Sequence, residues 1–185
     1  MALSSWICAG IVWPECEVVK TEFRYQCSPD QWQELIGALA ADPNRNSLVA
    51  SKVREYLGPD NRALLLRDRI EHARLLVSQL GDLAPVLLTG DLSAAERKRG
   101  MRDVKAGARL TIATVHLLGE GVDVPGWDLL FLASPFSGGP RTLQAIGRVA
   151  RPAPGKARAL VVDFVDPKVP LLASAFRKRK ALYAA

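Results

Sequence analysis

Five apolar runs of strand length most constrain how this 185-residue chain can fold. They lie at residues 63–66, 85–89, 110–114, 129–133 and 159–165. The segments between them have the periodicity of helices, so strands and helices are expected to alternate along the chain. Strands that are apolar on both faces are typical of a parallel sheet covered by helices on both sides. The sequence therefore predicts a doubly wound α/β fold with a mostly parallel sheet.

Local start and stop signals place helices between these runs. Ser93 and Glu96 have the spacing of a capping box, which predicts a helix over 94–106. Further helices are expected over 70–80, over 140–151 and from residue 171 onward. The helix over 140–151 is expected to end there because Pro152 disfavours helical geometry in the residue before it.

The first 60 residues have a less regular pattern. An extended stretch over 17–23 is followed by two expected helices, which begin near Ser28 and near Asp42, each before a proline at the first helical position. We therefore expect the chain to have three parts. These are an N-terminal leader and helical segment over 1–60, an α/β core over 61–168 and a C-terminal helix over 169–185.

Composition limits the compartment and the kinds of partner. A net charge of +6 and a pI near 9.5 favour anionic partners such as nucleic acid or nucleotides. Three cysteines without a C-x-x-C pair fit reduced thiols, which indicates a cytoplasmic protein. Neither histidine has a second histidine or cysteine at metal-ligand spacing, so no structural metal is expected. No apolar run reaches the roughly 18 residues of a membrane span.

The expected helix over 140–151 separates polar from apolar side chains. At about 100° per residue, four polar side chains fall within an arc of about 80°. They are Arg141, Gln144, Arg148 and Arg151, and the side expected to pack on the sheet carries Leu143, Ile146 and Ala150. Gly147 lies beside the polar face and weakens the helix, which close approach by another surface would explain. A solvated basic face is the alternative explanation of the same pattern.

The order of these residues adds a family resemblance. QAIGRVAR at 144–151 resembles motif VI of superfamily 2 helicases, and ATVHLLGEGVDVP at 113–125 resembles motif V. Upstream, 63–76 resembles motif IV and 88–99 the strand, loop and helix that follow it, all in the family's order. The chain is therefore similar to the second RecA-like lobe of such helicases over about residues 62–166.

This resemblance implies roles for individual residues in a motor driven by ATP. Arg148 and Arg151 would be arginine fingers, whose rigid guanidinium forks match phosphate geometry, and Gln144 would contact the phosphates or the attacking water. The implied nucleotide-binding residues are Glu120, Gly121, Asp123 and Gly147, with Asp123 on a ribose hydroxyl. The implied nucleic-acid contacts are Thr114, Arg67 and Arg141.

Two features of a complete helicase motor are not found in these 185 residues. There is no G-x-x-x-x-G-K-[ST] loop and no strand that ends in Asp-Glu, and the segment 154–157 is expected to be a turn. A first RecA-like lobe, in the same or another chain, would therefore hold most of the ATP and its Mg²⁺, and the isolated chain should not hydrolyse ATP.

Nucleic acid is the expected partner, with DNA favoured over RNA and with weak binding that falls steeply as salt rises. The basic run over 177–180 is either a further phosphate contact or a solvated helix end. Two alternatives stay open. One is a non-catalytic nucleic-acid or protein-binding module derived from such a lobe, favoured if the gene encodes no P-loop upstream. The other is a nucleotide-sugar enzyme with a similar sheet.

Overall fold

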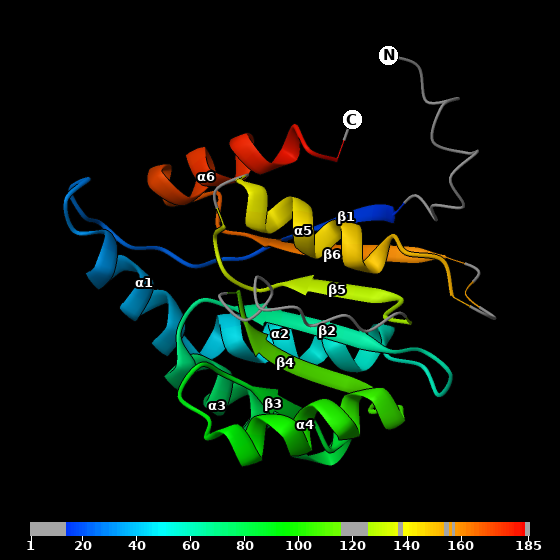
Figure 1. The fold of residues 1–185 in the computed structure, drawn as a ribbon. Helices are drawn as coiled ribbons and strands as arrows, with labels where there is room; N and C mark the ends of the chain where they lie inside the picture. Colours follow the sequence, from blue (N-terminus) through cyan, green and yellow to red (C-terminus); the bar gives the residue numbers. More distant parts are fainter. Residues whose placement is uncertain (1–13, 116–125, 137–138, 154–155, 157, 184–185) are drawn as a thin grey trace.

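The computed structural model describes residues 14–115, 126–136, 139–153, 156 and 158–183 (Figure 1). These residues form one parallel sheet with the strand order β1-β6-β5-β2-β4-β3. The strands are β1 (Pro14–Lys20), β2 (Ala63–Arg67), β3 (Val86–Leu88), β4 (Leu110–Thr114), β5 (Leu129–Leu132) and β6 (Ala159–Val165). All five apolar runs are strands, so the prediction of a parallel α/β sheet is confirmed.

The edge strand β1 comes from the N-terminal segment of the chain. It pairs with β6 along its whole length, from Pro14 opposite Ala159 to Lys20 opposite Val165. The extended stretch expected at 17–23 therefore begins earlier than expected and belongs to the main sheet. The N-terminal segment and the central segment thus share one sheet.

The described residues also form six α-helices, five between strands and one after the last strand. They are α1 (Trp32–Ala41), α2 (Pro43–Tyr56), α3 (Ile70–Gln79), α4 (Ala94–Ala106), α5 (Pro140–Val149) and α6 (Pro170–Lys180). A short 3-10 helix, η3 (Gly81–Leu83), follows α3. The bounds of α4 match the sequence prediction, and Ser93 and Glu96 form the expected capping box.

The two N-terminal helices start differently. Asp42 caps α2 as predicted, because its carboxylate accepts a hydrogen bond from the Arg45 backbone N–H at 2.7 Å. The predicted start of α1 near Ser28 is wrong. The Ser28 backbone N–H and hydroxyl both donate to the Gln31 side-chain oxygen at 3.0 Å, which closes a turn, and the helix begins only at Trp32.

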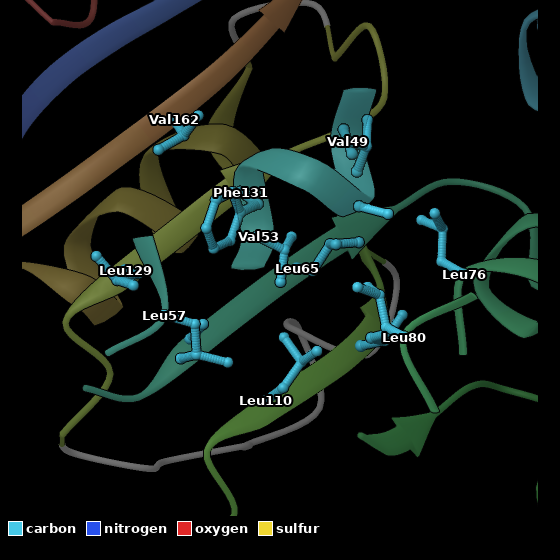
Figure 2. Close-up of a cluster of buried hydrophobic side chains, with 14 of the residues drawn as sticks. Val49, Val53, Leu57, Leu65, Leu76, Leu80, Leu110, Leu129, Phe131 and Val162 are labelled. Atoms are coloured by element: carbon cyan, nitrogen blue, oxygen red, sulfur yellow. The ribbon is translucent and has the colours of Figure 1, made fainter. Parts of the chain in front are cut away.

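Both faces of the sheet are covered. Helices α2 and α3 pack on one face, where Val53 and Leu76 meet Leu65 and Phe131 of the central strands (Figure 2). Helices α4 and α5 pack on the other face, where Val104 and the α5 residues contact the alternate strand positions. A third cluster joins α1 to the start of α6 through Leu35, Leu39, Val169 and Leu172. The packed sheet therefore positions the residues that follow the carboxyl ends of its strands.

Candidate nucleotide and nucleic-acid interface

Helix α5 carries polar residues beside the face that packs on the sheet. The residues that pack against the sheet are Thr142, Ala145 and Val149, which are all buried. Arg141, Gln144 and Gly147 are exposed and Arg148 is half-buried. Arg141 and Arg148 lie next to the buried Ala145 around the helix axis, and Gln144 lies farther from it. Three of the four residues of the predicted polar face therefore lie together along one side of α5, beside its buried face.

The buried side of α5 differs from the expected one, since Thr142, Ala145 and Val149 pack on the sheet and, of the expected residues, only Ala150 is fully buried. Leu143 was expected to pack on the sheet, but its side chain is 50% exposed. The buried face is centred on Thr142 and Ala145, and Leu143 lies about 100° from Thr142 around the helix axis. Thr142 and Ala145 pack between α5 and the sheet, and Leu143 lies outside this packed face.

The end of α5 also differs from the expectation. The helix ends at Val149 with Ala150 as its C-cap, so Arg151 lies beyond the last turn and is exposed. Arg148 and Arg151 both make contacts within the chain. A Cβ atom added to Gly147 would meet no described atom within 4 Å. The predicted approach of another surface there therefore stays a prediction.

Lys156 fastens the end of this helix, a role that sequence reasoning missed. Its ammonium group donates to the backbone oxygens of Trp127 at 2.6 Å and Arg151 at 3.0 Å, and also to that of Val149. Partial burial lowers the pKa of Lys156, and the charge of Asp128 offsets part of that effect. A cation at this position satisfies carbonyl groups that the end of a helix leaves without partners.

Lys156→Met is expected to lower the free energy of unfolding by about 1–3 kcal/mol, because three backbone carbonyl groups lose their donor. Urea denaturation followed by circular dichroism measures this change. Lys178→Met, on the exposed side of α6, is the control and should stay within about 0.5 kcal/mol of the parent. Equal changes in the two variants would show that the lysine at 156 does not fasten the helix.

At the carboxyl ends of the strands lies a buried ionic network. The Arg45 guanidinium donates to both carboxylate oxygens of Asp166, at 2.8 and 3.1 Å, and to the Ala133 backbone oxygen at 2.9 Å. The hydroxyl of Thr21 donates to the same carboxylate at 2.5 Å. Arg45 and Asp166 are both buried. The network therefore ties α2 to the ends of three neighbouring strands, β1, β6 and β5.

Arg67 is a second buried guanidinium at this edge. It is 0% exposed, and its Nη2 contacts the His72 ring, whose Nε2 lies 2.6 Å from the Asn46 side-chain oxygen. Its Nε and Nη1 atoms have no hydrogen-bond partner among the described residues. Burial lowers the pKa of Arg67 well below its usual value, and the charge of Arg45 adds to this effect.

Two of the predicted nucleic-acid contacts are buried in this structure, and their contact with nucleic acid stays a prediction. Arg67 lies inside the protein at the end of β2, and Thr114 at the end of β4 is only 3% exposed. Both residues are the last of a central strand that is buried along its whole length. Arg141 is exposed at the start of α5 and is the one of the three that a ligand can reach.

A cavity of about 390 Å³ opens at this same edge of the sheet. It lies between α1 and the first turn of α5, and Trp32, Asp68, Ser134, Phe136 and Arg141 contribute to its lining. Open α/β sheets bind their ligands beyond the carboxyl ends of the strands. The cavity combines two aromatic side chains with a cation, and Trp32 gave no signal in the sequence because it stands outside every recognised motif.

The remaining predicted site residues lie outside the described residues. Glu120, Gly121 and Asp123 belong to residues 116–125, and the predicted turn at 154–157 is described only at Lys156. Within the described ranges, no group of three His, Cys, Asp or Glu side chains could hold a metal ion. In the same ranges, no helix has the length and apolar character needed to cross a membrane.

Comparison with known families and proteins gives a consistent match. Residues 34–153 match the family model described as helicase conserved C-terminal domain. The chain is 33% identical over 116 residues to UvrABC system protein B of Pseudomonas aeruginosa, covering 59% of the chain and 17% of that protein. It is 30% identical over 118 residues to transcript termination protein OPG145 of variola virus, covering 61% of the chain and 24% of that protein. The chain thus spans about a quarter or less of these relatives.

Solved structures share the fold at lower sequence identity. T4 UvsW superposes with a TM-score of 0.64 and 20% identity, over 91% of this chain and 39% of that one. S. cerevisiae Dbp5 bound to RNA and ADP BeF3 superposes with a TM-score of 0.60 and 19% identity, over 76% of this chain and 36% of that one. The separate C-terminal domain of Dbp5 gives a TM-score of 0.61 at 18% identity, over 77% of this chain and 78% of that one.

Proposed function

Since the chain belongs to the helicase conserved C-terminal domain family and has the RecA-like fold of second superfamily 2 lobes, we propose that it is the second motor lobe of an ATP-dependent nucleic-acid helicase or translocase. The observation that carries this proposal is the polar face of α5. Arg141, Gln144 and Arg148 lie together along one side of the helix, beside its buried residues, where Arg141 and Gln144 are exposed and Arg148 is half-buried. There they can meet a ligand held by a facing lobe.

The chemistry of this face fits a transferring phosphoryl group. When ATP and Mg²⁺ are bound, mainly by a first lobe, negative charge develops on the γ-phosphate oxygens during hydrolysis. The guanidinium groups of Arg148 and Arg151 offer paired donors that match phosphate oxygens. Gln144, one turn before Arg148, can orient a water or accept and donate hydrogen bonds at the phosphates. The exposed Gly147 leaves room for the facing surface.

Three further residues complete the proposed nucleotide contacts. Glu120, Gly121 and Asp123 are assigned to the nucleotide because they match motif V, with the Asp123 carboxylate accepting a hydrogen bond from a ribose hydroxyl. The glycine would let the backbone approach the nucleotide closely. These assignments rest on the sequence pattern alone.

Nucleic acid is proposed to bind at the cavity beyond the strand ends. Arg141 can contact a phosphate there, and the rings of Trp32 and Phe136 can stack on bases. The expected preference for DNA over RNA stays a prediction, and the similarity to Dbp5, which was solved bound to RNA, makes RNA an equal candidate. Binding assays should therefore use both.

A two-lobe protein tests this proposal. If the gene encodes a P-loop lobe, the chain is joined to that lobe, and ATP turnover is measured with and without single-stranded DNA or RNA. We expect nucleic acid to stimulate turnover in the two-lobe protein, and the isolated chain to show none above background. Turnover by the pure chain would contradict the division of the active site between lobes. A gene without a P-loop lobe, together with nucleic-acid binding that ignores ATP, would favour the binding-module alternative.

A further inference from the structure

Helix α4 carries a basic face that neither the fold nor the proposed active site uses. Its inner side holds Gly100 and Val104 against the sheet. A Cβ atom on Gly100 would lie only 2.9 Å from the Leu88 side chain, so the helix lies very close to β3. Because the capping box at Ser93 and Gly107 at the C-cap fix both ends, the direction of the outer face is well determined.

Four cations share that outer face. Lys98, Arg99, Arg102 and Lys105 are all exposed. Their positions place them within an arc of about 120° around the helix axis. They surround one shallow hollow of about 640 Å³, to which Ala95 and Met101 also contribute. The four residues, here called the α4 stripe, therefore form a continuous basic surface along a single helix.

The α4 stripe has no acidic partner within the described part of the chain. None of the ion pairs between described residues includes any of the four. Hydrogen bonds from Ser93, with a smaller effect of Arg99, lower the pKa of Glu96, but the Glu96 carboxylate is already bound by Ser93. The positive charge of the stripe is thus available to a partner outside the chain.

The composition of the stripe favours a polyanion over a folded protein. Stable protein interfaces are built around buried apolar or aromatic side chains, with charged residues depleted at the centre. Here the apolar contributions to the hollow are only Ala95 and the half-buried Met101, and the rest is cationic. Helix α4, which carries the stripe, packs on the same face of the sheet as α5 (Figure 1).

We propose that the α4 stripe is a second nucleic-acid contact, which binds the phosphate backbone without reading its bases. This inference rests on the proposed function in one respect, namely that nucleic acid is the partner. The stripe lies on a different helix from the residues that line the cavity at the strand ends. The proposed contact therefore adds a second surface of this lobe to the one that nucleic acid is proposed to bind at the cavity.

The test neutralises the stripe in the full chain. Lys98→Ala, Arg102→Ala and Lys105→Ala are combined, since alanine favours the helix and removes three charges. The matched control removes three exposed cations from α6, with Arg177→Ala, Lys178→Ala and Lys180→Ala. Anisotropy of labelled single-stranded DNA and RNA gives Kd at several salt concentrations, with polyglutamate as a competing acidic polypeptide. Thermal melts check that both variants keep the fold of the parent.

We expect the α4 variant to bind about tenfold more weakly at low salt and to lower the slope of log K against log salt by about 2, from three lost phosphate contacts on a single strand. The α6 control should keep the parent slope, a result that would also assign the exposed cations of the run over 177–180 to a solvated helix end. Equal losses in both variants, an unchanged slope, or polyglutamate that displaces nucleic acid from the parent at equal charge concentration would each overturn the proposal.

The two-lobe protein separates this inference from the proposed function. If the inference holds there, the α4 variant reaches the parent's turnover but needs more nucleic acid for half-maximal stimulation. If the two-lobe protein has no ATPase activity but the α4 variant still loses binding, the proposed function fails and the α4 contact stands. If ATPase activity is normal and nucleic-acid binding is unchanged in the α4 variant, the proposed function stands and the α4 contact fails.

Discussion

Replacing Arg148 with alanine in the two-lobe protein is expected to reduce nucleic-acid-stimulated ATP turnover by about 10³-fold or more, the usual size of an arginine-finger effect. Arg148 is half-buried and lies in the last turn of α5, beside the residues that pack on the sheet. Alanine removes the cation from the transition state and leaves the buried residues of the helix in place. Steady-state turnover at saturating ATP and nucleic acid measures the loss.

Two variants make this result specific. Arg148→Lys keeps a positive charge without the planar fork of donors, so we expect it to recover only part of the lost turnover. Leu143→Ala changes a half-exposed residue of the same helix that contacts neither proposed ligand, and should leave turnover near that of the parent. A loss of less than tenfold in Arg148→Ala, with nucleic-acid affinity unchanged, would remove Arg148 from the proposed active site.

The largest expected effect on stability comes from Asp166→Asn. This change leaves the guanidinium of Arg45 buried without its counter-charge, and breaking one side of a buried ion pair costs about 3–5 kcal/mol. The free energy of unfolding from urea denaturation measures the loss. Asp82→Asn removes a carboxylate from an exposed pair with Arg54 and should have a much smaller effect.

A double variant shows whether the pair itself or the unpaired charge is responsible. Arg45→Met combined with Asp166→Leu replaces both ions with apolar side chains, which is often close to neutral for a buried pair. We therefore expect the double variant to be more stable than Asp166→Asn alone. If Asp166→Asn costs less than about 1 kcal/mol, the network does not hold α2 to the strand ends as the contacts indicate.

Much of the fold follows from local sequence patterns. Runs such as 63–66 are apolar at every position, and a strand buried on both faces accommodates that pattern. The side chains of Ser93 and Asp42 each fix a helix start by accepting a hydrogen bond from the backbone N–H three residues later. The signal at Ser28 was misleading, because there the same kind of side-chain bond closes a turn before the helix.

The site was less predictable, because its charged residues find partners far along the chain. Arg45 pairs with Asp166, 121 residues later, and no local pattern marks that contact. Arg67 resembled a surface cation of motif IV but lies inside the protein. In the basic run over 177–180, Arg179 is only 1% exposed because it is bound to Asp163 of β6. The sequence shows that an arginine is charged, but it does not show whether the side chain is buried or exposed.

The parallel pairing of β1 with β6 determines which shorter fragments of this lobe keep its sheet edge. Both strands lie outside the matched residues 34–153. A fragment trimmed to that match would end its sheet at β5, whose sequence Leu-Leu-Phe-Leu is uncharged and buried throughout. The natural edge strand instead carries Glu15, Glu17 and Lys20, charges that discourage edge-to-edge association with other chains. The charged residues of β1 therefore discourage the pairing of this sheet edge with the edge of another chain.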